Sequence, residues 1–190
     1  MDYLKTYLDI KNDYQKKRIP YSVLLNTLEW KEKRKLIIHR ENNTCQICKN
    51  RCADDYILIF KGNFVSKVPA VIKEVSKKNI DAFGDDFDSI SLELIEQEIP
   101  LIAHVHHTYY VLNKLPWEYP NGDLMLVCHK CHTEIHETTE INIYIDNKNG
   151  KTINLTHCKK CKGSGYLPEY NYYQNGLCFS CGGSCYEEWK

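Results

Sequence analysis

The chain has 190 residues, 43% of them hydrophobic, and its 25 basic side chains are balanced by 25 acidic ones. This composition supports a folded core and excludes wholesale disorder, and no apolar run approaches the roughly 18 residues expected of a membrane-spanning helix. The first residues lack the basic-then-apolar order of a signal peptide, so we expect a cytoplasmic protein. In such a reducing compartment, the ten cysteines favour metal sites over disulfides.

The neutral total hides an uneven charge distribution. Residues 1–52 carry 12 Lys and Arg against 6 Asp and Glu, whereas residues 53–103 carry 5 against 10. A basic N-terminal region can contact phosphates although the whole molecule is neutral. A solvated helix surface would explain the same basic residues without any partner.

The first elements expected along the chain are helices. Apolar side chains at roughly helical spacing predict a helix within residues 2–18, which Pro20 ends. A second helix is expected over about 26–40, with Asn26 and Glu29 forming a capping box at its start. The polar side of this second helix carries five basic residues, namely Lys31, Lys33, Arg34, Lys35 and Arg40.

Strands and short helices are expected in the rest of the chain. Residues 56–60 predict a strand, about 69–79 a short helix, and 81–88 an acidic loop. Apolar, β-prone residues 101–106 predict a strand that ends in two histidines. A short strand over 124–127 and a helix over about 130–138 follow, before a turn or linker at 146–150.

Eight of the ten cysteines fall into four C-x2-C pairs, and Cys52 and Cys185 are left over. Two such pairs supply the four thiolates of a tetrahedral structural zinc site. The tail after residue 156 is rich in cysteine and glycine and too poor in aliphatic residues to fold without a metal. We therefore expect two zinc sites, formed by Cys45, Cys48, Cys128 and Cys131, and by Cys158, Cys161, Cys178 and Cys181.

Histidines form a third candidate site. His132 and His136 are four residues apart in a predicted helix, so both imidazoles lie on one face and reach one cation. His106 and His107 are neighbours at a strand end and point to opposite faces, so one can ligate a metal while the other lies beside a substrate phosphate. Asp123 precedes the next strand, where a carboxylate can orient an imidazole.

In combination, these motifs resemble the HNH endonucleases, the ββα-metal nucleases. The resemblance covers about half of the chain, and its residues are Cys45-x2-Cys48, His106-His107 and Asp123-Leu124-x-Leu126-x-Cys128-x2-Cys131-His132-x3-His136. The basic helix before the first cysteine pair looks like the one these nucleases place there, which implies that its five basic residues contact DNA. The resemblance implies an α+β fold with a ββα-metal core.

The resemblance also assigns roles to the histidines. His107 matches the general base that takes a proton from water. His106, His132 and His136 match the ligands of a divalent catalytic metal (Mg²⁺, Mn²⁺, Ni²⁺ or Zn²⁺) that stabilises the leaving oxygen. The implied reaction is hydrolysis of DNA phosphodiester bonds by histidine-activated water.

Two features depart from the family pattern. Asp123 stands where asparagine is usual, so that its carboxylate or a backbone carbonyl would hold the imidazole of the base; Asn113 and Asn121 are nearby alternatives. The span from Cys48 to His106 is also longer than the family usually shows, which implies an insertion at about 53–100.

The expected organisation is an N-terminal helical region (1–40), a nuclease domain (41–140) with that insertion, a linker or strand (141–156) and a small zinc-bound module (157–190). The tail resembles half of the cysteine-rich domain of DnaJ-type chaperones, which implies a zinc fold but not chaperone function. No organic cofactor is expected. A non-catalytic, zinc-containing nucleic-acid-binding module and a chaperone-like adaptor acting through the tail are the alternative functions.

Overall fold

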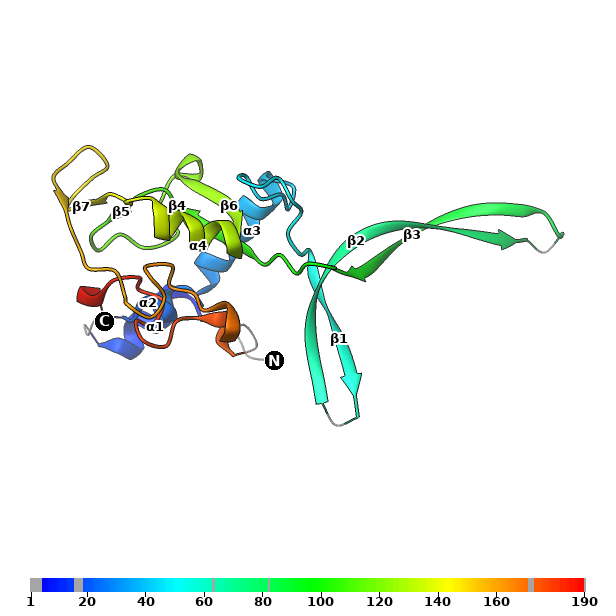
Figure 1. The fold of residues 1–190 in the computed structure, drawn as a ribbon, viewed down its shortest axis with the longest axis horizontal. Coiled ribbons are helices and arrows are strands. Elements are labelled where there is room, and N and C mark those ends of the chain that lie inside the picture. Colours follow the sequence, from blue (N-terminus) through cyan, green and yellow to red (C-terminus); the bar gives the residue numbers. More distant parts are fainter. Residues whose placement is uncertain (1–4, 16–18, 63, 82, 171–172, 190) are drawn as a thin grey trace. The chain divides into compact units, whose positions relative to one another are not determined.

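The computed structural model describes residues 5–15, 19–62, 64–81, 83–170 and 173–189. The chain forms two compact units, one from the described residues of 1–49 and 103–190 and the other from 50–102 (Figure 1). Both helices and sheets are present, so the predicted α+β class is confirmed. Within the described part of the chain, no helix is long and apolar enough to cross a lipid bilayer.

The first unit begins with three helices, α1 (Tyr7–Tyr14), α2 (Tyr21–Leu24) and α3 (Leu28–Arg40). Helix α1 falls inside the range predicted for the first helix, of which residues 1–4 and 16–18 lie outside the described residues. A capping box fixes its start, because the Thr6 hydroxyl accepts from the Asp9 amide and the Asp9 carboxylate accepts from the Thr6 amide.

The capping residue predicted for the second helix is wrong. Thr27, rather than Asn26, caps α3 by accepting a hydrogen bond from the Trp30 amide at 3.3 Å. The Asn26 side chain instead donates to the Ser22 carbonyl. The Glu29 carboxylate accepts from the amide of Tyr7, at the start of α1, and so joins the two helices. A hydroxyl one residue later in the chain fits the helix start equally well, and the sequence pattern alone does not separate the two.

Two antiparallel strands followed by a helix position the histidines. Strand β4 (Ala103–His107) pairs with β6 (Leu124–Cys128), with Ala103 opposite Cys128 and His107 opposite Leu124. A single 3₁₀ turn, η1 (Asn121–Asp123), leads into β6, and α4 (His129–Thr138) follows β6 directly. The strands predicted at 101–106 and 124–127 and the helix predicted at about 130–138 are therefore confirmed, with ends shifted by one or two residues.

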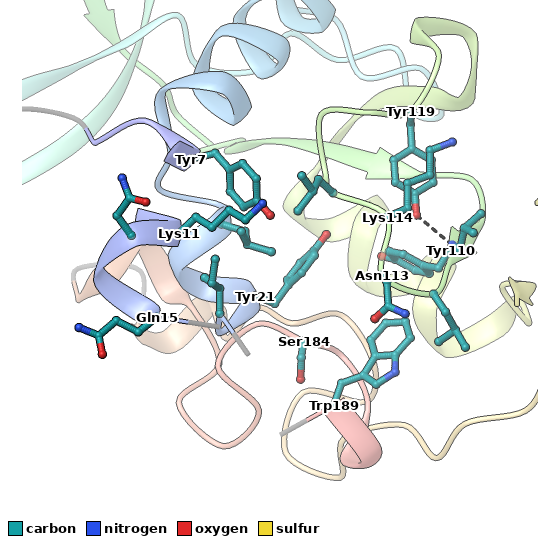
Figure 2. A pocket seen from close by; sticks show the side chains of 16 residues that line it. Tyr7, Lys11, Gln15, Tyr21, Tyr110, Asn113, Lys114, Tyr119, Ser184 and Trp189 are labelled. Atoms are coloured by element: carbon teal, nitrogen blue, oxygen red, sulfur yellow. Dashed lines mark hydrogen bonds between the residues drawn. The ribbon is translucent and has the colours of Figure 1, made fainter. Parts of the chain in front are cut away.

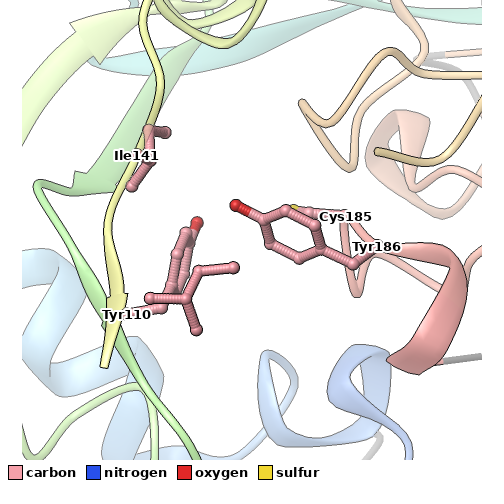
Figure 3. Close-up of a cluster of buried hydrophobic side chains, with 5 residues drawn as sticks. Tyr110, Ile141, Cys185 and Tyr186 are labelled. Atoms are coloured by element: carbon pink, nitrogen blue, oxygen red, sulfur yellow. The ribbon is translucent and has the colours of Figure 1, made fainter. Parts of the chain in front are cut away.

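A small mixed sheet and the C-terminal tail complete the first unit. Strand β5 (Tyr110–Val111) pairs in parallel with β7 (Ile143–Tyr144), which pairs with β8 (Thr152–Ile153). The tail contains the 3₁₀ turns η2 (Pro168–Tyr170), η3 (Gln174–Gly176) and η4 (Glu187–Trp189). Tyr186 extends from the tail toward Tyr110 and Ile141 in a buried cluster (Figure 3), so the tail shares a core with this sheet.

The second unit is an antiparallel sheet of β1 (Asp55–Lys61), β2 (Phe64–Ile80) and β3 (Asp86–Glu96) in sequence order. The strand predicted at 56–60 is confirmed as β1, and the expected insertion at about 53–100 lies within this unit. The short acidic turn after β2 is held by the Asp81 carboxylate, which accepts from the amides of Phe83 and Asp85.

The helix predicted at about 69–79 is wrong, because these residues belong to β2, with Ala70 to Ile80 paired to Glu96 to Asp86. Val71, Ile72 and Val75 satisfy a helical spacing, but they are β-branched and pack better on a pleated strand. The long register with β3 decides between the two structures, and this register is invisible to a local pattern.

Candidate metal centres and histidine cluster

The first predicted zinc site is assembled from two distant segments. Cys45 and Cys48 follow α3, whereas Cys128 ends β6 and Cys131 lies in the first turn of α4. The four sulfur atoms lie within 4.8 Å of one another, and the Cys48 and Cys128 sulfurs are 3.9 Å apart. Tetrahedral zinc with bonds of about 2.3 Å needs sulfurs about 3.8 Å apart, so this cluster suits structural zinc.

Backbone contacts prepare this cysteine cluster for a metal. The amide of Gln46 donates to the Leu126 carbonyl at 2.8 Å and holds the first cysteine pair against β6. Burial opposes ionisation of Cys45, but backbone amides including that of Cys128 outweigh it and lower the pKa of the thiol to about 7. A thiolate is the form that binds zinc, so the lowered pKa favours binding through Cys45, whereas burial raises the pKa of Cys128 and Cys131.

The second predicted zinc site lies within the tail. The sulfurs of Cys158, Cys161, Cys178 and Cys181 are all buried and lie within 4.8 Å of one another. Those of Cys161 and Cys181 are 3.8 Å apart, which again suits tetrahedral zinc. All ten cysteines lie in the described part of the chain, and the structure joins none of them in a disulfide there.

The tail contains two copies of one motif. The pattern C-x2-C-x-G-S-x-Y occurs at 158–166 and again at 178–186. In both copies the serine hydroxyl donates to the carbonyl of the second cysteine, from Ser164 at 2.8 Å and from Ser184 at 2.7 Å. Cys185 takes the place of Gly165 and adopts the same left-handed backbone, with φ of 71° against 68°. The two copies begin 20 residues apart, at Cys158 and Cys178, so the repeat is visible in the sequence itself.

Three of the predicted histidines converge on one point. The rings of His106 from β4 and of His132 and His136 from α4 have centroids 4.7 to 5.4 Å apart. Their candidate ligand atoms lie within 4.8 Å of one another, close enough that the three side chains could hold one metal ion. Several of their ring nitrogens are buried and have no hydrogen-bond partner in the described part of the chain, namely Nδ1 of all three and Nε2 of His136.

Burial keeps these three histidines neutral at pH 7. It lowers the pKa of His106 to about 4 and that of His136 to about 3, and it holds the pKa of His132 well below its usual range. A neutral imidazole carries the lone pair that binds a metal, whereas a buried polar atom without any partner costs about 1–3 kcal/mol. A metal ion would take one nitrogen from each of the three rings, so the donor set fits one.

His107 lies on the other face of β4, in an aromatic pocket. Its ring stacks on Trp30 at a centroid distance of 5.3 Å and meets the edge of Tyr119 at 4.6 Å. Its Nε2 lies 2.9 Å from the Pro116 carbonyl oxygen, so this nitrogen carries the proton and donates it. Burial lowers the pKa of His107 to about 4 despite the Pro116 contact, which leaves the ring neutral.

The Asp123 carboxylate is not brought to His107, contrary to the orienting role we expected. It accepts hydrogen bonds from the Tyr109 hydroxyl and the Lys148 ammonium, each at 2.7 Å. Of the two alternatives, Asn113 is exposed in the loop after β5, and the Asn121 carbonyl accepts from Arg40. The carbonyl that holds His107 belongs to Pro116, which no side-chain motif reveals.

The basic residues of α3 divide into two groups. Arg34 donates to the Ala103 carbonyl, and Arg40 donates to the carbonyls of Asn121 at 2.5 Å and Leu124 at 2.7 Å. These two guanidinium groups therefore hold α3 against the β4–β6 pair. Lys31 and Lys35 are exposed. Lys33 is partly covered, and burial and the Arg40 charge lower its pKa.

The tail packs beside the histidine cluster. The ring of His104 lies 4.8 Å from that of His132, and Tyr166 of the tail meets His104 edge-on at 4.4 Å. Lys162 of the tail forms an ion pair with Glu137 of α4 at 2.9 Å. His104 and His106 are two residues apart in β4 and therefore lie on the same face of the strand. This spacing was the feature of the sequence that indicated a fourth histidine near the cluster.

Comparison of the chain with known protein families, with curated proteins and with solved structures finds no match.

Proposed function

We propose that this protein is a metal-dependent endonuclease of the HNH type that hydrolyses DNA phosphodiester bonds. The observation that carries the proposal is the convergence of His106, His132 and His136, each with a buried ring nitrogen that has no hydrogen-bond partner among the described residues. His107, which follows His106 in the chain, is neutral. The order of β4, β6 and α4 around these histidines is the order expected of a ββα-metal core.

Histidines and lysines of the chain support hydrolysis of a phosphodiester bond. A divalent ion held by the three histidines would supply Lewis-acid stabilisation of the charge that grows on the phosphate. His107 donates through Nε2 to the Pro116 carbonyl, so its Nδ1 is the nitrogen left to accept a proton from water. Stacking on Trp30 fixes the plane of this imidazole. The exposed Lys31 and Lys35 would contact DNA phosphates.

A plasmid-cleavage assay tests the proposal. Purified protein is incubated with supercoiled plasmid in magnesium, manganese, nickel or EDTA, beside His107→Ala and a control, His39→Ala, which removes an exposed histidine of α3. We expect metal-dependent nicking or linearisation by the wild type and by His39→Ala, and a loss of at least about 100-fold in His107→Ala. Circular dichroism and zinc content confirm that the variants are folded.

A second candidate function is a non-catalytic nucleic-acid-binding module. The burial of His107 favours it, because the side chain is only 3% exposed and lies between Trp30 and Tyr119. In this case the folded, zinc-loaded protein would bind DNA and cut none with any of the metals. Lys31→Gln combined with Lys35→Gln would then weaken DNA binding, whereas His107→Ala would leave it unchanged.

A further inference from the structure

A pocket of about 580 Å³ lies in the first unit, apart from the metal centres. It is lined by α1, the start of α2, the loop around β5 and the end of the tail (Figure 2). Its volume lies within the range typical of small-molecule sites. The histidine cluster does not line it, so the function proposed above leaves this pocket unused.

Aromatic rings dominate the walls of the pocket. Two of them, Tyr110 and Tyr119, are buried, and the Tyr119 hydroxyl is fixed because it accepts a hydrogen bond from the Val111 amide at 2.9 Å. Trp189 is partly exposed and meets Tyr110 nearly at a right angle, with centroids 6.0 Å apart. Tyr7 and Tyr21 complete the set (Figure 2). Such walls favour a flat aromatic ligand, because ring faces and edges give it stacking and edge contacts.

The charged side chains that line the pocket are both cations. The ammonium of Lys114 lies 4.7 Å from the centroid of Tyr119, and that of Lys11 lies 5.9 Å from the centroid of Tyr7. No Asp or Glu occurs among the described lining residues. The pocket is therefore suited to an anion as well as to an aromatic ring.

Carboxylates next to the lining residues in sequence are engaged with other groups. Asp13 pairs with Lys5 at 2.6 Å, and Glu118 accepts from the Leu115 amide at 2.8 Å. Glu188 accepts from the Thr156 amide at 2.9 Å. Because these three carboxylates are already engaged, they compete less with a bound anion for Lys11 and Lys114.

Polar groups that can recognise the edge of a ring are also present. Asn12, Gln15 and Asn113 line the pocket, and all three are exposed. An amide offers both a donor and an acceptor, which is what the edge of a nucleobase requires.

We propose that this pocket binds a nucleotide unit, with the heteroaromatic base among the tyrosine and tryptophan rings and the phosphate at Lys11 and Lys114. The unit is a free nucleoside monophosphate or the terminal nucleotide of a strand, since both present the same ring and phosphate. The proposal does not depend on cleavage, because a monophosphate has no internucleotide bond to hydrolyse.

Isothermal titration of the full-length, zinc-loaded protein tests the proposal. The probes are deoxyadenosine monophosphate and thymidine monophosphate, beside 2-deoxyribose 5-phosphate, which lacks the base. The variants are the double substitution Lys11→Gln and Lys114→Gln and a control, Lys151→Gln, which removes an exposed lysine that does not line the pocket. We expect saturable binding of at least one monophosphate, weakened about tenfold in the double variant and unchanged in the control.

Three results would overturn the proposal: no binding of either monophosphate, equal binding by the wild type and the double variant, or equal binding of the sugar phosphate. A dinucleotide with a 5′ phosphate identifies the source of the ligand. Tighter binding of the dinucleotide than of the monophosphate assigns the pocket to a strand end, and equal binding assigns it to a free nucleotide. Both results support a nucleotide site.

Discussion

At the scale of single residues, the contacts of Asp123 in the folded chain differ from those that its place in the sequence suggested. Its place before β6 suggested a group that orients the histidine base, but its carboxylate binds Tyr109 and Lys148. Burial and this hydrogen bond raise the pKa of Tyr109 to about 12. The carboxylate therefore ties the loop after β4 to the turn after β7, a structural role.

The pH dependence of stability tests this role. Hydrogen bonds from Lys148 and Tyr109 lower the pKa of Asp123 below 3.8, so its stabilisation is present above that value and is lost as the pH falls through the lower folded pKa. We expect Asp123→Asn to cost about 1 kcal/mol at pH 7, since Lys148 is 55% exposed, and to cost progressively less as the pH falls below about 4.

Thermal unfolding at pH 7 and at about pH 2.5 measures this difference. The matched control is Asp146→Asn, because Asp146 is exposed in the turn after β7. Wild-type stability together with loss of DNA cleavage in Asp123→Asn would instead restore an orienting role in catalysis.

At the scale of elements, helix α3 combines an internal and an external use of basic side chains. Arg34 and Arg40 donate to backbone carbonyls of β4, β6 and the turn before β6, whereas Lys31 and Lys35 face solvent. An arginine fork can satisfy several carbonyls at once, which a single ammonium cannot do with the same geometry. The helix is therefore anchored by its arginines, whereas Lys31 and Lys35 remain exposed.

Substituting one arginine and one lysine of α3 separately distinguishes the anchoring of the helix from contact with DNA. Arg40→Gln removes its contacts with the Asn121 and Leu124 carbonyls, so we expect it to destabilise the protein by about 1–2 kcal/mol. Lys35→Gln should leave the melting temperature unchanged and reduce the slope of log affinity for DNA against log salt by about 0.9. Melting curves and DNA titrations at several salt concentrations measure both effects. Equal stability losses in the two variants would contradict this division.

At the scale of the whole molecule, two clusters of cysteines suited to zinc bring together separate segments of the chain. One cluster connects the turn after α3 with the junction of β6 and α4, and the other closes the tail on itself. The tail has few buried aliphatic side chains. Among the described residues, Leu167 is the one aliphatic residue in the buried core around the second cysteine cluster. A metal ion held by these cysteines would therefore supply much of the folding free energy of the tail.

Single cysteine substitutions should remove the two metals independently. Cys48→Ser is expected to lose the first site and Cys161→Ser the second, with selective unfolding of the tail in the latter. Cys185→Ala is the control, because Cys185 is buried beside the second cluster without belonging to it. In cobalt-substituted protein, thiolate-to-metal absorption should fall by about half in each ligand variant and stay unchanged in the control. Full absorption in Cys161→Ser would contradict the second site.

The sequence by itself determined the features that depend on short spacings. Two cysteines or two histidines a few residues apart have a geometry fixed by their own turn or helix, so the four C-x2-C pairs and the His132–His136 pair were recognisable without the fold. The strands β1, β4 and β6 and the helix α4 were equally visible, because their apolar patterns are local and strong.

Only the tertiary structure decided the features that depend on distant partners. Residues 69–79 carry a pattern compatible with a helix, and the register with β3 made them a strand. His107 meets the Pro116 carbonyl and Trp30, and Asp123 meets Tyr109 and Lys148, because folding brings these groups together across the chain. A hydrogen bond to a backbone carbonyl leaves no trace in residue type, since every residue has that carbonyl, so no sequence pattern could have revealed what holds His107.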